Sequence, residues 1–362
     1  MQPSRQYKAW KYIIAIACIV VSGFVLLEAC LRIGGFYYTY TEKMDGQYVS
    51  YYNAIRPSWY YETPRPYDSI TDMKPEYNYL SLTNNYGYRD RDFDTNNDAH
   101  VTKMLVLGDS FAEGMGAPQD STWPHLLESL LNQQDSSKYR VYNCGAAGSD
   151  PFFEYVMLRD KWIKLKPDKV IMSINYSDIN DYITRGGMER FRPDGTVAYN
   201  KGPWFEPLYK RSHVARLFVH FILRYDFSLL SPSEHADKVK EALDKIADCA
   251  ASARELCKSK NIAFLVVLHP YIDPYDRYLK KQDQLPLIEK LLRKGNIEVI
   301  NLFEDFAKRV NESNYQTYSW PRDMHYTSQG YDLFAHLLWR RINTDYPDLL
   351  KKQTDNSQPA KQ

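Results

Sequence analysis

The 362-residue sequence lacks an excess of charge of either sign, because 46 lysines and arginines face 45 aspartates and glutamates. Without a net field or a dense basic cluster, nucleic acid is disfavoured as a partner. The five cysteines do not form a disulfide framework, and none has the spacing of a metal-binding pair. Gly114-Met115-Gly116 lacks the third glycine of a dinucleotide-binding loop. We therefore predict no metal and no cofactor.

An apolar run near the N-terminus is the first feature that is present. Between residues 12 and 31 the only charged side chain is Glu28, and a helix of about 20 residues crosses a hydrocarbon core of about 30 Å. Arg5, Lys8 and Lys11 precede the run. We therefore expect a cytoplasmic tail at 1–11, a transmembrane signal anchor at 12–31, and the remainder on the periplasmic side of the cell membrane.

Two other readings of this run stay open, and both also export the chain. A signal peptide could be cleaved near Ser22-Gly23, and residues 27–30 resemble a lipoprotein cleavage box in which Glu28 is an unusual member. A buried helix of a cytosolic protein is disfavoured, since a basic flank followed by an apolar run is typical of export.

The rest of the chain divides by composition. Residues 36–100 are rich in Tyr, Pro, Asn and Asp and are expected to form an irregular N-terminal extension. From 101 to 345, short apolar runs alternate with segments of helical periodicity, as in one α/β domain. An irregular insert at 182–235 interrupts it and is either a lid or a surface excursion. Residues 346–362 are expected to be a disordered tail.

The alternation within 101–345 predicts a three-layer α/β/α sandwich around a five-stranded, mostly parallel sheet of the flavodoxin-like kind. Its strands are expected at 104–107, 139–143, 170–174, 262–268 and 297–302. The main helices are expected at 123–131, 153–165, 237–258 and 286–294, with another after Gly330.

Two polar residues at the ends of this domain suggest catalysis. Gly108-Asp109-Ser110 directly follows the first strand, where a strand-to-helix turn exposes a serine above the sheet. Near the end, His325 is a residue of the type that serves as a general base, and Asp323 is close enough to orient its ring. His269 could contact substrate or serve as a turn residue, whereas Asp109 is expected to be structural and His125 to lie on the surface.

With these motifs, residues 103–342 resemble the SGNH/GDSL hydrolase family. The resemblance implies Ser110 as nucleophile, Asp323 and His325 as its partners, and Gly148, from Asn143-Cys144-Gly145-Ala146-Ala147-Gly148, as an oxyanion-hole donor beside Ser110. Two departures stand out. Asp323 and His325 are two residues apart instead of three, as in some membrane-anchored members. Ser177, in Asn175-Tyr176-Ser177-Asp178, replaces the oxyanion asparagine, a loss worth roughly 10²–10³ in turnover unless Ser177, Asn175 or Asn180 substitutes.

The resemblance and the export signal together predict an exported, membrane-anchored serine ester hydrolase that forms an acyl-enzyme and deacylates an O-acylated envelope glycan. Its partners would be an acylated small molecule or glycan and the membrane. Transfer of the acyl group to a polysaccharide is one alternative. The other is a non-catalytic glycan-binding or assembly factor on the same fold.

Overall fold

A computed structural model describes residues 5–34, 58–59, 67–73, 75–94, 100–134, 138–226, 228–272 and 284–350. The chain divides into two compact units. The helical unit contains residues 1–55, 183–185 and 199–239, and the sheet unit contains residues 56–182, 186–198 and 240–362. The predicted insert at 182–235 is therefore divided, with residues 186–198 in the sheet unit.

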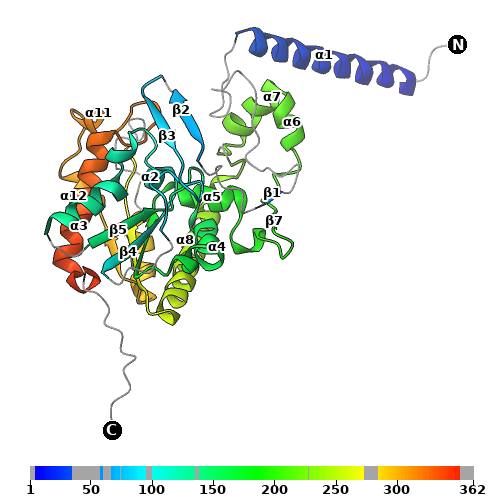
Figure 1. Ribbon diagram of the computed structural model, residues 1–362. Helices are drawn as coiled ribbons and strands as arrows, with labels where there is room; N and C mark the ends of the chain where they lie inside the picture. Colours follow the sequence, from blue (N-terminus) through cyan, green and yellow to red (C-terminus); the bar gives the residue numbers. More distant parts are fainter. Residues whose placement is uncertain are drawn as a thin grey trace. The chain divides into compact units, whose positions relative to one another are not determined.

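The sheet unit is built on a five-stranded parallel sheet (Figure 1). Its strands lie in the order β5-β4-β6-β8-β9, and every neighbouring pair is parallel. The second strand of this sheet along the chain, β5, lies on one side of β4, and the later strands β6, β8 and β9 are added on the other side. This strand order is typical of the flavodoxin-like arrangement. The strands are β4 (Val101–Leu107), β5 (Lys138–Asn143), β6 (Lys169–Ile174), β8 (Ala263–Leu268) and β9 (Val299–Asn301).

Helices cover both faces of this sheet, which confirms the predicted α/β/α sandwich (Figure 1). On one face lie α3 (Trp123–Gln134) and α12 (Ser328–Asp345), where the rings of Trp123 and Phe334 stack 4.6 Å apart. On the other lie α4 (Pro151–Asp160) and α8 (Pro232–Ser259), joined where the Cys249 thiol donates to the Pro151 carbonyl. The residues of the five strands of this sheet are almost all buried, because helices cover both of its faces.

Several helix boundaries differ from the sequence-based expectation, and capping explains two of them, the starts of α4 and α8. The Asp150 side chain caps the start of α4, and the helix ends at Asp160 before a separate 3₁₀ turn over 162–165. Helix α8 begins five residues earlier than predicted, because Ser231 and Glu234 exchange side-chain and backbone hydrogen bonds in a capping box.

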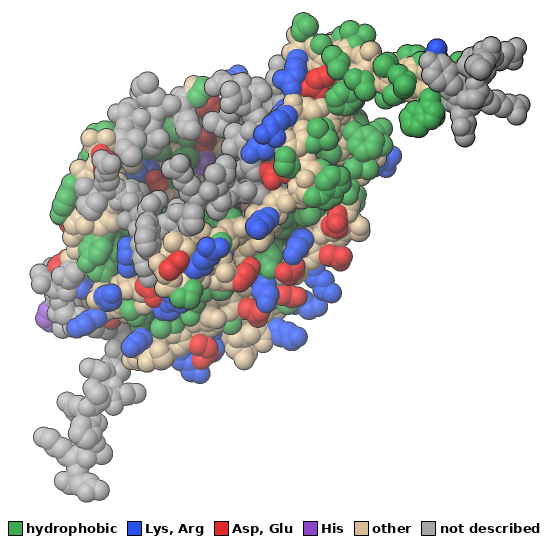
Figure 2. Space-filling model, turned by 90° about the vertical axis from the view of Figure 1, so that its right-hand side faces the viewer, with side chains coloured by type: hydrophobic (Ala, Val, Ile, Leu, Met, Phe, Trp, Pro, Cys, Tyr) green, Lys and Arg blue, Asp and Glu red, His purple; other side chains and the backbone are tan. Residues whose placement is uncertain are grey.

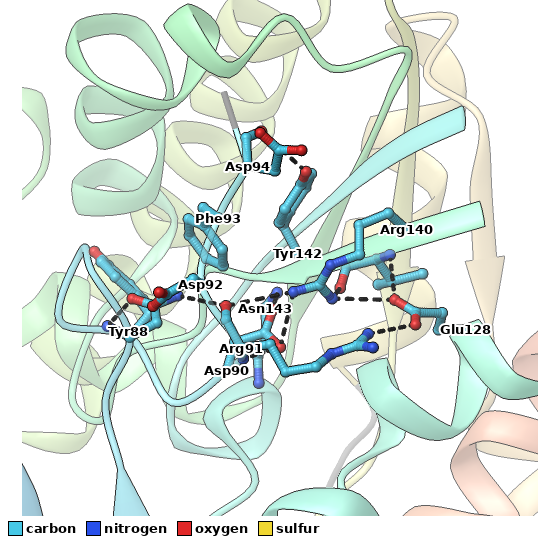
Figure 3. Close-up of polar contacts among 12 residues, drawn as sticks. Tyr88, Asp90, Arg91, Asp92, Phe93, Asp94, Glu128, Arg140, Tyr142 and Asn143 are labelled. Carbon is cyan, nitrogen blue, oxygen red and sulfur yellow. Dashed lines mark hydrogen bonds and ion pairs between the residues drawn. The ribbon is translucent and has the colours of Figure 1, made fainter. Parts of the chain in front are cut away.

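The described residues between 67 and 94, which precede the parallel sheet, belong to the sheet unit. Strands β2 (Ser69–Met73) and β3 (Asn78–Leu82) form an antiparallel hairpin. The residues after it pack onto β5 and α3 through a buried polar network (Figure 3). There Asp90 accepts from the Asn143 N–H at 2.9 Å, and Arg140 bridges Asp90 and Glu128.

The helical unit contains α1 (Arg5–Gly34), α6 (Glu206–Arg211) and α7 (His213–Leu217), which continues into the π-helical turn η5 (Phe218–Ile222). Residues Trp10–Gly34 of α1 are long and apolar enough to cross a membrane.

The remaining elements are short. They are β1 (Ser58–Trp59), α2 (Ser110–Glu113), η2 (Gln119–Ser121), η3 (Trp162–Leu165), α5 (Ser177–Arg185), η4 (Met188–Arg190), β7 (Thr196–Val197), α9 (Gln284–Lys294), α10 (Phe303–Ala307), α11 (Tyr315–Tyr318) and η6 (Pro347–Leu350). Leu349 is buried and the Tyr139 hydroxyl donates to the Leu350 carbonyl, so the fold continues past the predicted start of the tail at 346. Residues 351–362 lie outside the described part.

Candidate active site

The turn after β4 presents Ser110 at the carboxyl edge of the sheet. Ser110 is the first residue of α2, and the Asp109 side chain caps this helix by accepting from the Phe111 N–H at 2.9 Å. A side chain at Gly108 would place its Cβ 2.7 Å from that of Ala112, so the close strand-to-helix packing requires glycine. The first N–H groups of a helix have no partner within the helix, and the Ser110 N–H is one of them.

The loop before α12 brings His325 to this serine. The Nε2 atom of His325 lies 2.7 Å from the Ser110 Oγ, and its Nδ1 atom bonds Asp323 Oδ1. Met324, which lies between Asp323 and His325 in the sequence, has a positive φ of 68°, and the backbone turns sharply there. The structure therefore places the three predicted catalytic residues in one hydrogen-bonded chain, although 215 residues separate Ser110 from His325.

This chain of contacts has the parts that acyl transfer requires. A histidine within hydrogen-bonding reach of a serine can accept its proton, and a carboxylate on the opposite ring nitrogen fixes the tautomer and stabilises the imidazolium. The side chains of His325 and Asp323 are 17% and 19% exposed, so the pair is partly shielded from water and remains open to a substrate.

Two residues from the segment before β4 hold the catalytic loops, and the sequence analysis did not single them out. The Glu76 carboxylate accepts the backbone N–H groups of Arg322 at 3.0 Å and Asp323 at 2.9 Å. The buried Arg89 guanidinium donates to the carbonyls of Gly114 at 2.7 Å and Ala117 at 2.5 Å. Glu76 thus holds the loop that carries His325, and Arg89 holds the loop over residues 114–117 that follows Ser110.

The two braced loops also contact each other. The Trp320 indole N–H donates to the Gly116 carbonyl at 2.8 Å, and the Tyr79 hydroxyl accepts from the Gly116 N–H at 3.2 Å. Gly116 has a φ of 94°, and a Cβ there would lie 2.8 Å from the Tyr326 carbonyl oxygen, so no other residue fits without displacement. The relative position of serine and histidine is set by this contact.

Of the residues predicted to form the oxyanion hole, Ser177 already uses its hydroxyl in another hydrogen bond. Gly148 is exposed, with a φ of 74°. The Ser177 hydroxyl donates to Asn175 Oδ1 at 2.8 Å, and the Asn175 amide donates in turn to Asp109 Oδ2 at 2.8 Å. Ser177 would have to leave Asn175 before its proton could reach an oxyanion, and Asn175 is already engaged. The oxyanion role of Ser177 stays a prediction.

Buried carboxyl groups lie beneath the serine turn. Burial raises the pKa of Asp178 well above its usual value, and the negative charges of Asp109 and Glu154 raise it further. Burial likewise raises the pKa of Glu154, with Asp109 and Asp150 adding to the effect. These groups favour the neutral form, and the Asp109 carboxylate accepts from both Phe111 and Asn175, in line with its expected structural role.

His269 lies at the end of β8 and is fully buried. Its ring packs against those of Phe111, Phe334 and Tyr326, with centroids 5.1–6.0 Å away. Burial lowers its pKa to about 4, and the nearby charge of Asp109 opposes this only in part. Its Nδ1 atom lies 3.1 Å from the Pro270 carbonyl oxygen, so of the two interpretations offered by the sequence the structure favours the turn residue over one that contacts substrate.

Within the described ranges, no group of three or more His, Cys, Asp or Glu side chains is arranged to hold a metal ion. The predictions of no metal and no cofactor stay predictions.

Comparison with known proteins gives one family. A model of the GDSL-like lipase/acylhydrolase family matches residues 106–333. Among solved structures, the chain is similar to a two-domain esterase active on acetylated mannans, at 12% identity and a TM-score of 0.41, over 72% of this chain and 53% of that one. The chain therefore spans about half the length of that esterase. A search of curated proteins found no match.

Two further solved structures are similar. A variant of an acetyl-xylooligosaccharide esterase from Geobacillus stearothermophilus is 16% identical, with a TM-score of 0.42, over 68% of this chain and 95% of that one. The lipase/acylhydrolase from Enterococcus faecalis is 15% identical, with a TM-score of 0.40, over 70% of this chain and 100% of that one.

Proposed function

We propose that this chain, which belongs to the GDSL-like lipase/acylhydrolase family and is an ester-hydrolysing enzyme, deacylates an O-acylated glycan at the outer face of a membrane. Its catalytic residues in this proposal are Ser110, His325 and Asp323. The observation that carries this proposal is the contact of 2.7 Å between Ser110 Oγ and His325 Nε2, with Asp323 on the other ring nitrogen.

The reaction proceeds in two acyl-transfer steps. Ser110 Oγ attacks the ester carbonyl while His325 Nε2 takes the hydroxyl proton, and that proton then leaves with the alcohol as the carbon–oxygen bond breaks. Water attacks the acyl-enzyme and gives a proton to His325, which returns it to Ser110 Oγ as the bond between Oγ and the acyl carbon breaks and the acid leaves. The N–H groups of Ser110 and Gly148 stabilise the negative oxygen of both tetrahedral intermediates.

Aromatic side chains at the same edge of the sheet support a glycan substrate. Tyr176 follows β6 and Tyr271 follows β8, and their half-buried rings lie 6.1 Å apart. A tyrosine offers an apolar face beside a polar hydroxyl, which suits the alternating C–H and O–H surface of a sugar. Export to the periplasmic side and anchoring by α1 are supported by its apolar span and by the basic residues Arg5, Lys8 and Lys11 that precede it.

Matched substitutions in the full chain in detergent test the catalytic assignment. Ser110→Ala and His325→Gln should abolish hydrolysis of short-chain aryl esters and of an acetylated oligosaccharide, and Ser110→Ala should also prevent labelling by a fluorophosphonate. Ser129→Ala and His336→Gln, at sites on α3 and α12 outside the described catalytic chain, should keep both. Full activity of Ser110→Ala would refute the proposal.

Acyl transfer to a polysaccharide uses the same acyl-enzyme with a sugar hydroxyl in place of water, and analysis of products formed with an acylated donor and a glycan acceptor separates the two. The non-catalytic alternative rests on Ser177 standing in place of the family's oxyanion asparagine. It requires that Ser110 not react with the fluorophosphonate, whereas the contact with His325 favours reaction.

A further inference from the structure

The helical unit exposes large apolar side chains beyond those of α1. Trp204 is 90% exposed, and the segment that follows it through α6, α7 and η5 presents further side chains to solvent (Figure 2). These are Leu208, Phe218, Ile222 and Leu223, with exposed fractions of 58%, 50%, 67% and 39%. They do not form the core of the segment, because Tyr209, Val219 and Leu229 are buried together there instead. An exposed group of this kind marks a binding surface.

Side chains of α1 fix this segment to one end of the apolar helix. The Glu28 carboxylate accepts from the Ser212 hydroxyl at 2.8 Å and from the backbone N–H groups of His213 at 3.0 Å and Val214 at 2.9 Å. Arg32 bonds both Glu28 and the Arg211 carbonyl. The first turn of α7 is therefore held against the last two turns of α1.

The length of α1 places this contact at the level of a membrane surface. The apolar span Trp10–Gly34 has 25 residues, or about 37 Å of helix, against a hydrocarbon core of about 30 Å. Glu28 lies about 9 Å before the end of the helix, close to where the span would leave the core. Whatever is bound to Glu28 then lies beside the headgroups and not far out in water.

We propose that Trp204, α6, α7 and η5 form a second membrane contact, with their exposed apolar side chains inserted into the bilayer surface beside α1. This inference rests on the proposed anchoring of α1. The charge of the segment fits an anionic lipid surface, because residues 199–226 contain five lysines and arginines and two acids. Trp and Phe beside basic residues are typical of helices that lie in the interface.

Quenching of tryptophan fluorescence tests this contact in the full chain, reconstituted into vesicles of phosphatidylcholine and phosphatidylglycerol. The emission of Trp204 is obtained as the difference between the unaltered chain and Trp204→Phe. Interfacial helices insert about 5–10 Å, so lipids brominated near the top of the acyl chain should quench Trp204 roughly twofold more than lipids brominated near its end. The double substitution Leu208→Ser and Ile222→Ser should reduce this quenching. Leu287→Ser, at a leucine of α9 in the sheet unit that is 52% exposed, should not.

The outcomes separate this inference from the proposals on which it rests. Release of the chain from vesicles by alkaline carbonate would overturn the anchor and the docking together. Retention of the chain with Trp204 unquenched would overturn the docking alone. If Trp204 stays unquenched by brominated lipid and becomes accessible to iodide in the water only when the protein is diluted in lipid, the surface would be assigned to a second copy of the chain and the docking rejected. Hydrolysis of a soluble aryl ester in detergent reports on catalysis separately.

Discussion

The hydroxyl of Ser177 gives the sharpest test of how the oxyanion is held. The asparagine expected here would donate to the oxyanion, and removing one such donor costs roughly 10²–10³ in kcat. In the structure the Ser177 hydroxyl donates instead to Asn175 Oδ1 at 2.8 Å. A neutral hydrogen bond of this kind contributes about 0.5–1.5 kcal/mol to stability, and its loss would reach the transition state only through a shift of Asn175.

We therefore expect Ser177→Ala to lower kcat on an aryl ester by no more than about threefold, well below the cost of a lost oxyanion donor. Ser177→Asn, which supplies a longer amide donor, should raise kcat by roughly tenfold or more. Steady-state kinetics of both variants, with Ser129→Ala as the control and thermal unfolding to check folding, measures this. A fall of a hundredfold in kcat for Ser177→Ala would refute the reasoning, because the hydroxyl would then have to turn from Asn175 to the oxyanion.

Three further predictions concern the supports of the site. Glu76→Ala removes a charged acceptor of two backbone N–H groups, a contribution of about 1.5–3 kcal/mol. It should lower kcat/KM about tenfold. Glu76→Gln keeps one acceptor oxygen, and its kcat/KM should stay within about threefold of the unaltered chain. Arg140→Met removes the cation that bridges the buried Asp90 and the part-buried Glu128, while Arg91 still pairs with Glu128. It should lower the free energy of unfolding in urea by about 3 kcal/mol, with partial recovery when Asp90 is also made Asn. Burial lowers the pKa of His269 from 6.5 to about 4, so below pH 6.5 the unfolded chain binds a proton that the folded chain does not. Between pH 6.5 and 4 this residue should lower the free energy of unfolding by up to about 3 kcal/mol. Urea unfolding across this pH range measures the decrease, and His269→Asn should remove the part due to this residue.

The parts of the fold that the sequence predicted are those that depend on local pattern. Runs such as 104–107 and 263–268 are apolar at every position because helices cover both faces of the sheet, and this pattern is visible without any neighbour. Ser110 and His325 were found because each follows a local signal, a strand-to-helix turn and a loop before a helix. Ser110 lies at the carboxyl edge of the sheet because it follows β4, but His325 follows no strand, and its contact with Ser110 was expected only from the family resemblance.

What the sequence did not reveal depends on contacts between distant backbone groups. Glu76 meets the backbone of residues more than two hundred positions away, and a peptide N–H has no side-chain signature. The hydrogen bonds of Arg89 to this loop go to carbonyl groups, so they are likewise independent of the residue type at the partner. The capping box of Ser231 and Glu234 was a readable signal that would have placed the start of α8 correctly.

The position of Glu76 and Arg89 has a practical consequence for anyone who wishes to shorten this chain. A cut at residue 100, where composition changes and the matched family region is about to begin, would keep every residue that performs chemistry and yet remove both residues that hold the serine and histidine loops. Such a fragment would retain its sheet and lose the alignment of its catalytic groups. A soluble form should therefore start before the β2–β3 hairpin, at residue 67 or earlier.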